Sequence, residues 1–556
     1  MKKMKYHILV ATALMVSMSS CEDFLDTSLD TNQTNETLAT NRGSIWAFAN
    51  AFYAPIHYGY SAIDGNIFAS ASDEAQQTSA SSDVIYFNKG MVNANVNPLS
   101  YHYTNCYEGI RAANYFLDYV ADGKGKALLE LNRNLVTDAD SYKRDLLSLD
   151  WYIAEAHIAR AYYYAELIKM YGGMPIIEQT MSQSGGAMVS RSSYEECVEY
   201  IVGEIDAWKD KLAKDWSNYA DREGRFTLGA ALALKSRVLL YAASPLHNPT
   251  DDHAKWLRAA QAANELLTCS DVSYSLDPSY DNYFKGETSL TSPETIYLVR
   301  REASNNLEKA NYPIATPGGR SGVCPTENLV SQYEYIGEPV ANDPYANRDP
   351  RLAASIVTNG SQWNGRQIAQ APGETDDMAH ANASPTGYYL RKFLTDELNL
   401  VQGQTAQHNW VAFRYAEILL NYAEAMNEAF GPNNRPDGFA MSAVEALQQV
   451  RDRASVSLPA VNSSTIETFR NAVKHERQIE LAFEDHRYWD LLRWKDAMRV
   501  LNQPVSGVKV SRSAQGYAYS VVEVAPRVFY ERNYYLPLLH SEIENSNGTL
   551  SQNPNY

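Results

Sequence analysis

The chain has 556 residues, and its 66 acidic residues outnumber its 48 lysines and arginines, which gives a formal net charge of −18. This acidic balance argues against a nucleic-acid partner, because binding to phosphates requires a basic surface. The length is sufficient for one large domain or for two domains in close contact.

The first twenty residues have the three-part layout of a secretory signal. Three lysines precede an apolar run from Ile8 to Met18, and small residues then lead to Cys21. The apolar run has about half the length that a membrane-spanning helix requires. We therefore predict that residues 1–20 are a lipoprotein signal peptide and that Cys21 is the lipidated residue. The alternative is an ordinary cleaved signal followed by a chance cysteine.

A helical region follows the signal. Residues 21–40 are rich in Thr and Asn and are predicted to be a flexible tether. Helical patterning begins near Ile45 and defines a region over residues 41–269, in which small residues at helical spacing allow close packing. Two helix starts, at Tyr194 and Leu228, are separated by about 34 residues, the period of tetratricopeptide repeats. This spacing favours paired helices.

Local signals define the ends of several of these helices. The strongest pattern runs from Trp151 to Tyr171 and ends at a Gly-Gly pair. Ser193 and Glu196 have the spacing of a capping box, which predicts a helix start. Thr227 is predicted to cap the next helix, which is rich in alanine.

Residues 270–410 differ from the sequence on either side. They contain ten prolines and no long helical period. Loops of this length are usually functional or disordered, and the many aromatic residues here argue against disorder. We therefore predict a folded, loop-rich region.

Helical patterning resumes in the last part of the chain, residues 411–556. It predicts helices over 413–425, 442–454 and 465–483. The tail from Val505 returns to short alternating segments, which are typical of strands.

Charged residues are grouped in and after the last of these helices: Glu476, Arg477, Glu480, Glu484 and Arg487. Their spacings of three, four and seven residues make them neighbours on a helix, where opposite charges pair. The carboxylate pair of a glycoside hydrolase instead lies across a cleft. We therefore predict a structural helix with partly buried ion pairs rather than an active site.

Sequence motifs for catalysis are weak or absent. His475 and Glu476 begin the zinc-hydrolase pattern, but the second histidine does not follow. Neither a nucleophile elbow nor a phosphate-binding loop occurs. Asp73 and Glu74 are predicted to cap a helix or to form a salt bridge. We therefore expect no enzyme active site, no metal site and no cofactor.

The remaining cysteines are Cys106, Cys197, Cys269 and Cys324. They are too far apart in sequence for a metal-binding pattern, and too few for a disulfide scaffold. We predict buried free thiols.

Several short segments, weak individually, occur in order along the whole mature chain. They are Cys21–Asp26, Ser72–Ala75, Ile110–Asn114, Arg160–Tyr164, Tyr171–Pro175, Phe413–Glu424, Glu476–Glu484, Arg487–Leu491, Leu536-Pro537, Ser541–Ile543 and Gln552–Tyr556. In this order and number they resemble the SusD/RagB family of outer-membrane lipoproteins.

The resemblance implies a mainly α-helical fold: a tetratricopeptide-like scaffold of helix pairs with a large loop-rich ligand-binding face. It implies a protein that is not an enzyme and that is lipid-anchored in the outer membrane, facing the cell exterior. Such proteins form the lid of a SusC-like TonB-dependent transporter and capture an oligosaccharide or, in some members, a peptide. A surface glycoside hydrolase or peptidase is a further alternative, which no motif supports.

The resemblance transfers no ligand contacts by position, so the candidates come from residue type. A sugar ring stacks its apolar face on Tyr or Trp, while Asn, Asp and Arg bond its hydroxyls. Any single ring is more often a packing residue than a ligand contact. The candidates are Tyr58, Tyr60, Asp64, Asn66, Tyr86, Phe87 and Asn88 near the N-terminus, and Tyr283, Tyr312, Trp363, Asn364 and Arg391 in the loop-rich region.

Overall fold

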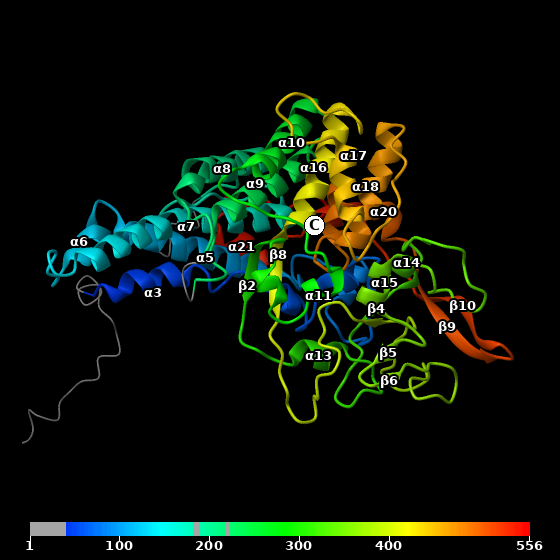
Figure 1. Ribbon diagram of the computed structural model, residues 1–556. Coiled ribbons are helices and arrows are strands. Elements are labelled where there is room, and N and C mark those ends of the chain that lie inside the picture. Colours follow the sequence, from blue (N-terminus) through cyan, green and yellow to red (C-terminus); the bar gives the residue numbers. More distant parts are fainter. Residues whose placement is uncertain (1–40, 182–188, 217–221) are drawn as a thin grey trace, which may run out of the picture.

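The computed structural model describes residues 41–181, 189–216 and 222–556. The predicted signal peptide, the lipidation site Cys21 and the predicted tether lie outside the described residues. The fold is mainly helical, as predicted: long helices form an elongated layer, and short helices, strands and loops lie beneath it (Figure 1). One hydrophobic core contains residues from Ile45 to Leu538, so both layers share it.

The long helices of the upper layer pack as antiparallel neighbours in tetratricopeptide fashion. α7 lies against α5 and α8, α9 lies against α10, and α16 lies between α10 and α17 (Figure 1). Tyr194 and Leu228, the two predicted starts, are the first residues of α8 and α9. The bounds are α3 Gly43–Ala51, α5 Ser100–Val120, α6 Lys124–Glu130, α7 Ala139–Tyr171, α8 Tyr194–Trp208, α9 Leu228–Ala243, α10 His253–Thr268, α16 Tyr415–Phe430, α17 Ala443–Arg451 and α18 Ile466–Glu480.

The predicted helix ends are confirmed by their hydrogen bonds. Ser193 Oγ accepts from the Glu196 amide at 3.2 Å, and the Glu196 carboxylate accepts from the Ser193 amide at 2.7 Å. The Thr227 hydroxyl accepts the Ala230 amide at 3.2 Å. α7 ends at Tyr171 as predicted but begins twelve residues before the predicted start. Its first turns are mostly exposed and therefore lack an apolar period.

In the described part of the chain, strands form five separate two-stranded antiparallel sheets. β1 pairs with β3 and thereby joins the N-terminal region to the loop-rich region, while β9 and β10 form a long hairpin (Figure 1). The bounds are β1 Ala75–Gln77 with β3 Val323–Pro325, β2 Thr295–Arg300 with β8 Asn409–Arg414, β4 Ile356–Val357 with β7 Tyr389–Leu390, β5 Gln362–Trp363 with β6 Arg366–Gln367, and β9 Val505–Ser513 with β10 Gly516–Ala525. The helix predicted from Phe413 therefore starts at Tyr415, because β8 occupies the two residues before it.

The short helices fill the lower layer and the C-terminal part. Those of the loop-rich region have four to six residues each, consistent with its predicted lack of a helical period. The bounds are α4 Ile85–Asn88, α11 Tyr280–Tyr283, α12 Thr288–Thr291, α13 Asn306–Asn311, α14 Glu327–Val330, α15 Pro350–Ser355, α19 Arg487–Arg493, α20 Ala497–Val500 and α21 His540–Asn545.

The charged residues of α18 form a structural network, as predicted, but the predicted partners are wrong. Glu480 is fully buried and contacts Arg351 at 2.9 Å, Arg414 at 2.8 Å and Arg453 at 2.8 Å. These arginines come from α15, β8 and the end of α17, not from α18. Helical spacing cannot reveal partners that the tertiary fold supplies. The network ties the loop-rich region to the C-terminal helices.

The segments that carried the family resemblance contact one another. Asp73 forms two hydrogen bonds of 2.8 Å with Arg487, which confirms the predicted salt bridge. The Glu74 carboxylate accepts the amide of Phe483, whose φ of 68° lies in the left-handed region, at 3.0 Å. Asn553 near the C-terminus donates to the Tyr171 carbonyl at 3.0 Å. These motif residues therefore hold distant segments together.

The described residues include four cysteines, all of them free thiols. Cys106, Cys197 and Cys324 are buried free thiols, as predicted, whereas Cys269 is partly exposed. Within the described ranges, no helix is both long enough and apolar enough to cross a bilayer.

Candidate ligand-binding site

The two segments predicted to form one face do pack together. The amides of Asn66 and Asn311 exchange hydrogen bonds of 3.0 and 2.9 Å. The Tyr60 hydroxyl donates to the Asn409 carbonyl at 3.3 Å. The N-terminal stretch and residues 270–410 therefore form one structural unit, although these contacts are internal.

Seven of the twelve candidates for ligand contact are buried: Tyr60, Asn66, Phe87, Asn88, Tyr283, Tyr312 and Trp363. Trp363 packs edge-on against Tyr312, with ring centroids 5.1 Å apart. The Tyr312 hydroxyl donates to the Thr395 carbonyl and accepts the Leu398 amide at 3.1 Å. In this conformation these rings pack against other protein groups, so stacking on a ligand would require their surroundings to open, and that role stays a prediction.

The other candidates are partly or fully exposed. Tyr58 donates to the His408 carbonyl at 3.2 Å and lines a cavity of 320 Å³ with Tyr101 and Arg301. Arg391 is held by Asp396 at 2.7 Å. Tyr86 and Asn364 are partly exposed, and Asp64 is exposed. Of the twelve candidates, Tyr58 is the residue whose surroundings best suit a ligand, but its cavity is small.

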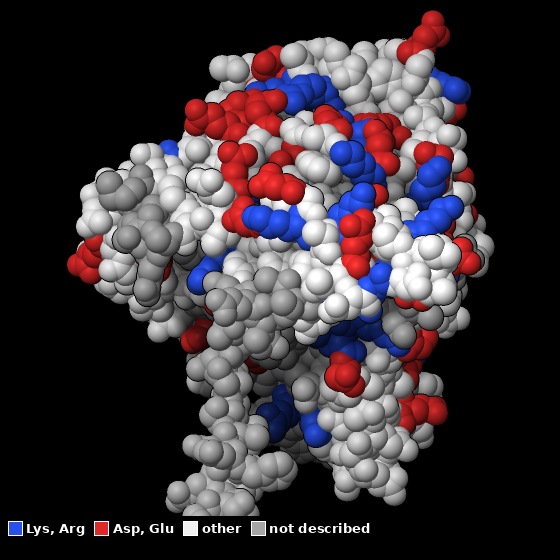
Figure 2. Space-filling view, turned by 90° about the vertical axis from the view of Figure 1, so that its left-hand side faces the viewer, with Lys and Arg blue, Asp and Glu red and all other residues white. Residues whose placement is uncertain are grey.

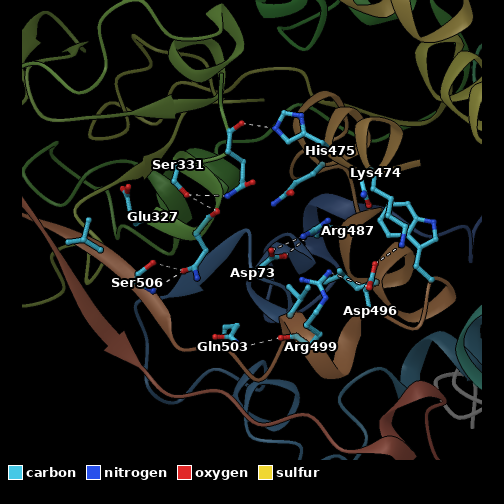
Figure 3. Close-up of a pocket in the computed structure, with 18 residues that line it drawn as sticks. Asp73, Glu327, Ser331, Lys474, His475, Arg487, Asp496, Arg499, Gln503 and Ser506 are labelled. Atoms are coloured by element: carbon cyan, nitrogen blue, oxygen red, sulfur yellow. Dashed lines mark hydrogen bonds and ion pairs between the residues drawn. The ribbon is translucent and has the colours of Figure 1, made fainter. Parts of the chain in front are cut away.

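A large cavity lies elsewhere, between α14, α18, the α19–α20 turn and the start of β9 (Figure 3). Its volume of about 910 Å³ falls in the range of small-molecule sites. Asp73 and Arg487 lie between its two sides in Figure 3, with Ser331 and Ser506 on one side and His475 on the other. Three parts of the chain that are far apart in sequence therefore build it: Asp73, residues 327–332 and residues 471–521.

The centre of this cavity is the pair of Asp73 and Arg487. Burial raises the pKa of the Asp73 carboxyl, but the charge and hydrogen bonds of Arg487 outweigh burial and keep the pKa below its usual range. The bidentate geometry fixes both side chains. An ion pair whose two charges cancel therefore lies at the centre of the cavity.

Side-chain hydrogen bonds fasten the two walls. His475 of α18 lies 2.8 Å, through Nε2, from the Gln332 carbonyl just after α14. Asn328 Oδ1 accepts from both the amide and the hydroxyl of Ser506, each at 2.8 Å. These bonds link α18 to α14, and α14 to the β9–β10 hairpin. Side-chain hydrogen bonds thus hold the walls in place.

The lining is polar and carries no net charge. The cations Lys474, Arg487 and Arg499 are matched by the carboxylates of Asp73, Glu327 and Asp496. Lys474 contacts Asp496 at 2.7 Å. Such a surface, in a chain with an excess of acid, suits a neutral ligand with many hydroxyl or amide groups better than an ion.

Stacking contributes little in this cavity. Trp494 is the aromatic residue of the lining, and it is buried, with its indole N–H donating to Glu424 at 2.7 Å. The Lys474 ammonium lies 4.9 Å from its ring centroid and covers one face. Recognition here would therefore depend on hydrogen bonds, for which the lining supplies amides, hydroxyls, an imidazole and guanidinium groups.

Sequence analysis missed this cavity because it treated α18 as purely structural. A signal was present: Asn471, Lys474, His475 and Gln478 follow one another at spacings of three, one and three residues. They form one polar stripe, and all four line the cavity. The buried carboxylates Glu476 and Glu480 lie on the other face of the same helix.

The packed helix pairs, with short strands and loops beneath them, define a mainly helical protein built on a repeat fold. Two family models match the chain: one described as the SusD family matches residues 293–556, and one described as "Starch-binding associating with outer membrane" matches residues 23–240. Between them they cover most of the chain.

Individual relatives agree with these matches. SusD-like protein P38 of Formosa agariphila is 25% identical over 399 residues, which cover 65% of this chain and 69% of that protein. A SusD-like protein of Bacteroides ovatus is 21% identical over 506 residues, which cover 88% of this chain and 83% of that protein.

Solved structures show the same fold. A SusD-like protein from Bacteroides fragilis superposes with a TM-score of 0.76 at 24% identity, covering 95% of this chain and 99% of that one. Surface glycan-binding protein A from Bacteroides uniformis superposes with a TM-score of 0.65 at 19% identity, and the match covers 92% of this chain and 99% of that one. The chain belongs to the SusD/RagB family, and the resemblance inferred from its motifs is confirmed.

Proposed function

We propose that this protein is a cell-surface lipoprotein that binds a neutral oligosaccharide in the cavity between α14, α18 and β9. The observation that carries the proposal is a preformed cavity of about 910 Å³ with a polar lining of zero net charge. The family adds support, because one of its models is described as starch-binding and associating with the outer membrane.

The cellular role that we propose is the one that the family resemblance implies. The protein acts as the lid of a SusC-like TonB-dependent transporter, captures glycan at the cell surface and delivers it for import without altering it. Lipidation at Cys21 would hold it in the outer membrane. The Cys21→Ala variant should then leave the membrane fraction in cells that lack the transporter, and retention there would contradict the anchor.

The binding proposal is tested with purified protein and a panel of neutral oligosaccharides, using calorimetry. Arg499→Ala removes a cavity residue whose side chain is 73% exposed, so the fold should remain intact. Loss of one or two hydrogen bonds from a charged donor should weaken binding about tenfold or more. Arg300→Ala is the matched control, because Arg300 is also exposed and also has one carboxylate partner, Glu287 at 2.9 Å.

Four outcomes decide between the alternatives. Weaker glycan binding by Arg499→Ala and normal binding by Arg300→Ala support the cavity. Binding of short peptides but not of glycans, with the same dependence on Arg499, would favour the peptide-importing type of family member. Glycan binding that neither variant affects would place the site elsewhere, with the small cavity at Tyr58 the next to test. Appearance of hydrolysis products would contradict a purely binding role.

A further inference from the structure

Exposed apolar side chains gather at one end of the helical layer. Leu131, Leu135 and Val136 lie in the connection between α6 and α7, and Leu147 lies on the first turns of α7; they are 36, 44, 86 and 44% exposed. In Figure 1 this connection lies at the extreme left of the molecule. Four of the fourteen large apolar residues that are exposed in the described chain therefore occur within seventeen residues.

One charged side chain of this connection turns inward. The Arg133 guanidinium is only 5% exposed and bonds Asp145 at 2.8 Å and the Ser141 hydroxyl at 2.9 Å. Asn134 Oδ1 accepts the amides of Val136 and Thr137 at 3.0 and 3.3 Å. These contacts fix the turn, and its leucines and valine share the outer surface with exposed polar residues.

The chain enters the fold beside this end. Phe48 of α3 packs on Tyr119, near the end of α5, with centroids 4.8 Å apart. Trp46 packs on Tyr152 of α7 at 5.4 Å. Tyr152 lies five residues along α7 from Leu147, a rise of about 7.5 Å. The first described residues of the chain are therefore within a few helical turns of the exposed apolar group.

The predicted lipid anchor makes a membrane the natural neighbour of this end. Residues 21–40 separate the predicted lipidated cysteine from the first described residue, and twenty residues span at most about 70 Å. The chain thus leaves the protein at α3, beside α6 and the start of α7, and this end lies within about 70 Å of the predicted lipidated residue. Residues 122–145 carry five cations and five acids, so this end lacks the acidic excess of the chain as a whole. Figure 2, which faces this end of the molecule, shows both signs interspersed.

We propose that the α6–α7 connection is a membrane-contacting tip, in which Leu131, Leu135 and Val136 insert into the interfacial layer of the outer membrane. The proposal rests on the lipid anchor of the proposed function. A lipid anchor on a single residue leaves the protein's orientation free, whereas a second, protein-borne contact fixes the tilt. A neutral tip can approach an anionic lipid surface that would repel an acidic one. The tip would then set the direction in which the cavity opens.

The test uses the full lipidated protein in vesicles of phosphatidylethanolamine and phosphatidylglycerol. Cysteine is introduced as Val136→Cys, in a Cys269→Ser background because Cys269 is the partly exposed native thiol, and is labelled with nitrobenzoxadiazole. Val401→Cys is the matched control, because Val401 is also a valine and is 75% exposed, in the loop-rich layer. The label in place of Val136 should shift to shorter emission wavelength and be quenched several-fold by lipid-borne nitroxide, whereas the label in place of Val401 should do neither.

The outcomes separate this inference from the anchor. If the protein floats with the vesicles but the label in place of Val136 remains water-like, the tip contact is wrong and the anchor stands. If the protein does not float, the anchor fails and this inference fails with it. Shielding that occurs only in membranes containing the transporter would replace lipid by a protein partner and overturn the proposal. Adding Leu135→Ser, at a surface position that the core does not need, should reduce the quenching at least twofold.

Discussion

The loop-rich region and the C-terminal helices satisfy their backbone polar groups in opposite ways. In α18 the backbone bonds are internal to the helix, so the side chains of one face are free to line a cavity. In residues 270–410, side chains instead form hydrogen bonds with the backbone groups. Arg348 donates to the carbonyls of Tyr333 at 2.8 Å and Val330 at 2.6 Å, and Tyr312 bridges two backbone groups.

This contrast explains why abundant aromatic and polar residues do not by themselves mark a ligand face. A loop that is packed into a core must recruit buried side chains as hydrogen-bond partners, because unsatisfied backbone groups are costly. Those side chains are then unavailable to a ligand. α18 presents a face of four polar side chains, and these line the cavity together with Glu327, Asn328, Ser331 and Gln332 of the loop-rich region. Each prediction below would strengthen or break this contrast.

The largest effect is expected at the buried network that joins the two regions. Arg351→Ala removes a cation from Glu476 and Glu480 and leaves both carboxylates buried. The free energy of unfolding should fall by about 3–5 kcal/mol. Denaturant unfolding measures the loss. Arg300→Ala, at an exposed ion pair, should cost less than about 1 kcal/mol, and equal losses for the two variants would contradict a structural role for the network.

A loss of stability is also expected inside the loop-rich region. Trp363→Ala empties a buried site beside Tyr312 and should lower the free energy of unfolding by about 3 kcal/mol. Thermal and denaturant unfolding check this. An unchanged melting temperature combined with loss of glycan binding would restore the ring as a ligand contact, and would break the contrast drawn above.

A pH-dependent effect is expected at Glu74, which lies at the junction of the two regions. Burial raises the pKa of its carboxyl to about 8, an effect that the Phe483 amide only partly offsets. The folded state therefore holds a proton that the unfolded state releases above its pKa near 4.5. Stability from this group is complete below about pH 4.5 and is lost as pH rises towards 8.

The Glu74→Gln variant tests that linkage, because glutamine does not titrate. Between pH 5 and pH 8 the variant should gain on the order of 2 kcal/mol of unfolding free energy relative to the parent. Urea unfolding at the two pH values gives the difference. A constant difference between the two proteins at both pH values would show that Glu74 stays ionised in the folded state.

The smallest effect on stability is expected on the cavity face of α18. Asn471 is exposed, so Asn471→Ala should change the free energy of unfolding by no more than about 0.5 kcal/mol. Loss of a hydrogen bond to ligand should nevertheless weaken glycan binding several-fold, as calorimetry would show. A variant that unfolds easily, or that binds normally, would argue against a free ligand-facing stripe on this helix.

Local sequence was sufficient for the elements. Capping at Ser193 and Thr227, the end of α7 at Tyr171 and the paired starts at Tyr194 and Leu228 depend on contacts within one turn or on one helical period. The salt bridge of Asp73 was predictable in kind, but not its partner Arg487, which is 414 residues away. Pairings over that distance are decided by the fold.

The sequence by itself determined the helical scaffold, its family and the loop-rich character of residues 270–410, because these follow from periodicity, caps and motif order. Only the tertiary structure decided which rings are buried, which partners Glu480 has and where a cavity remains. Residue type alone does not distinguish a buried tyrosine from an exposed one. The exposure of a tyrosine depends on what the rest of the chain brings against it, and that packing is a property of the whole fold.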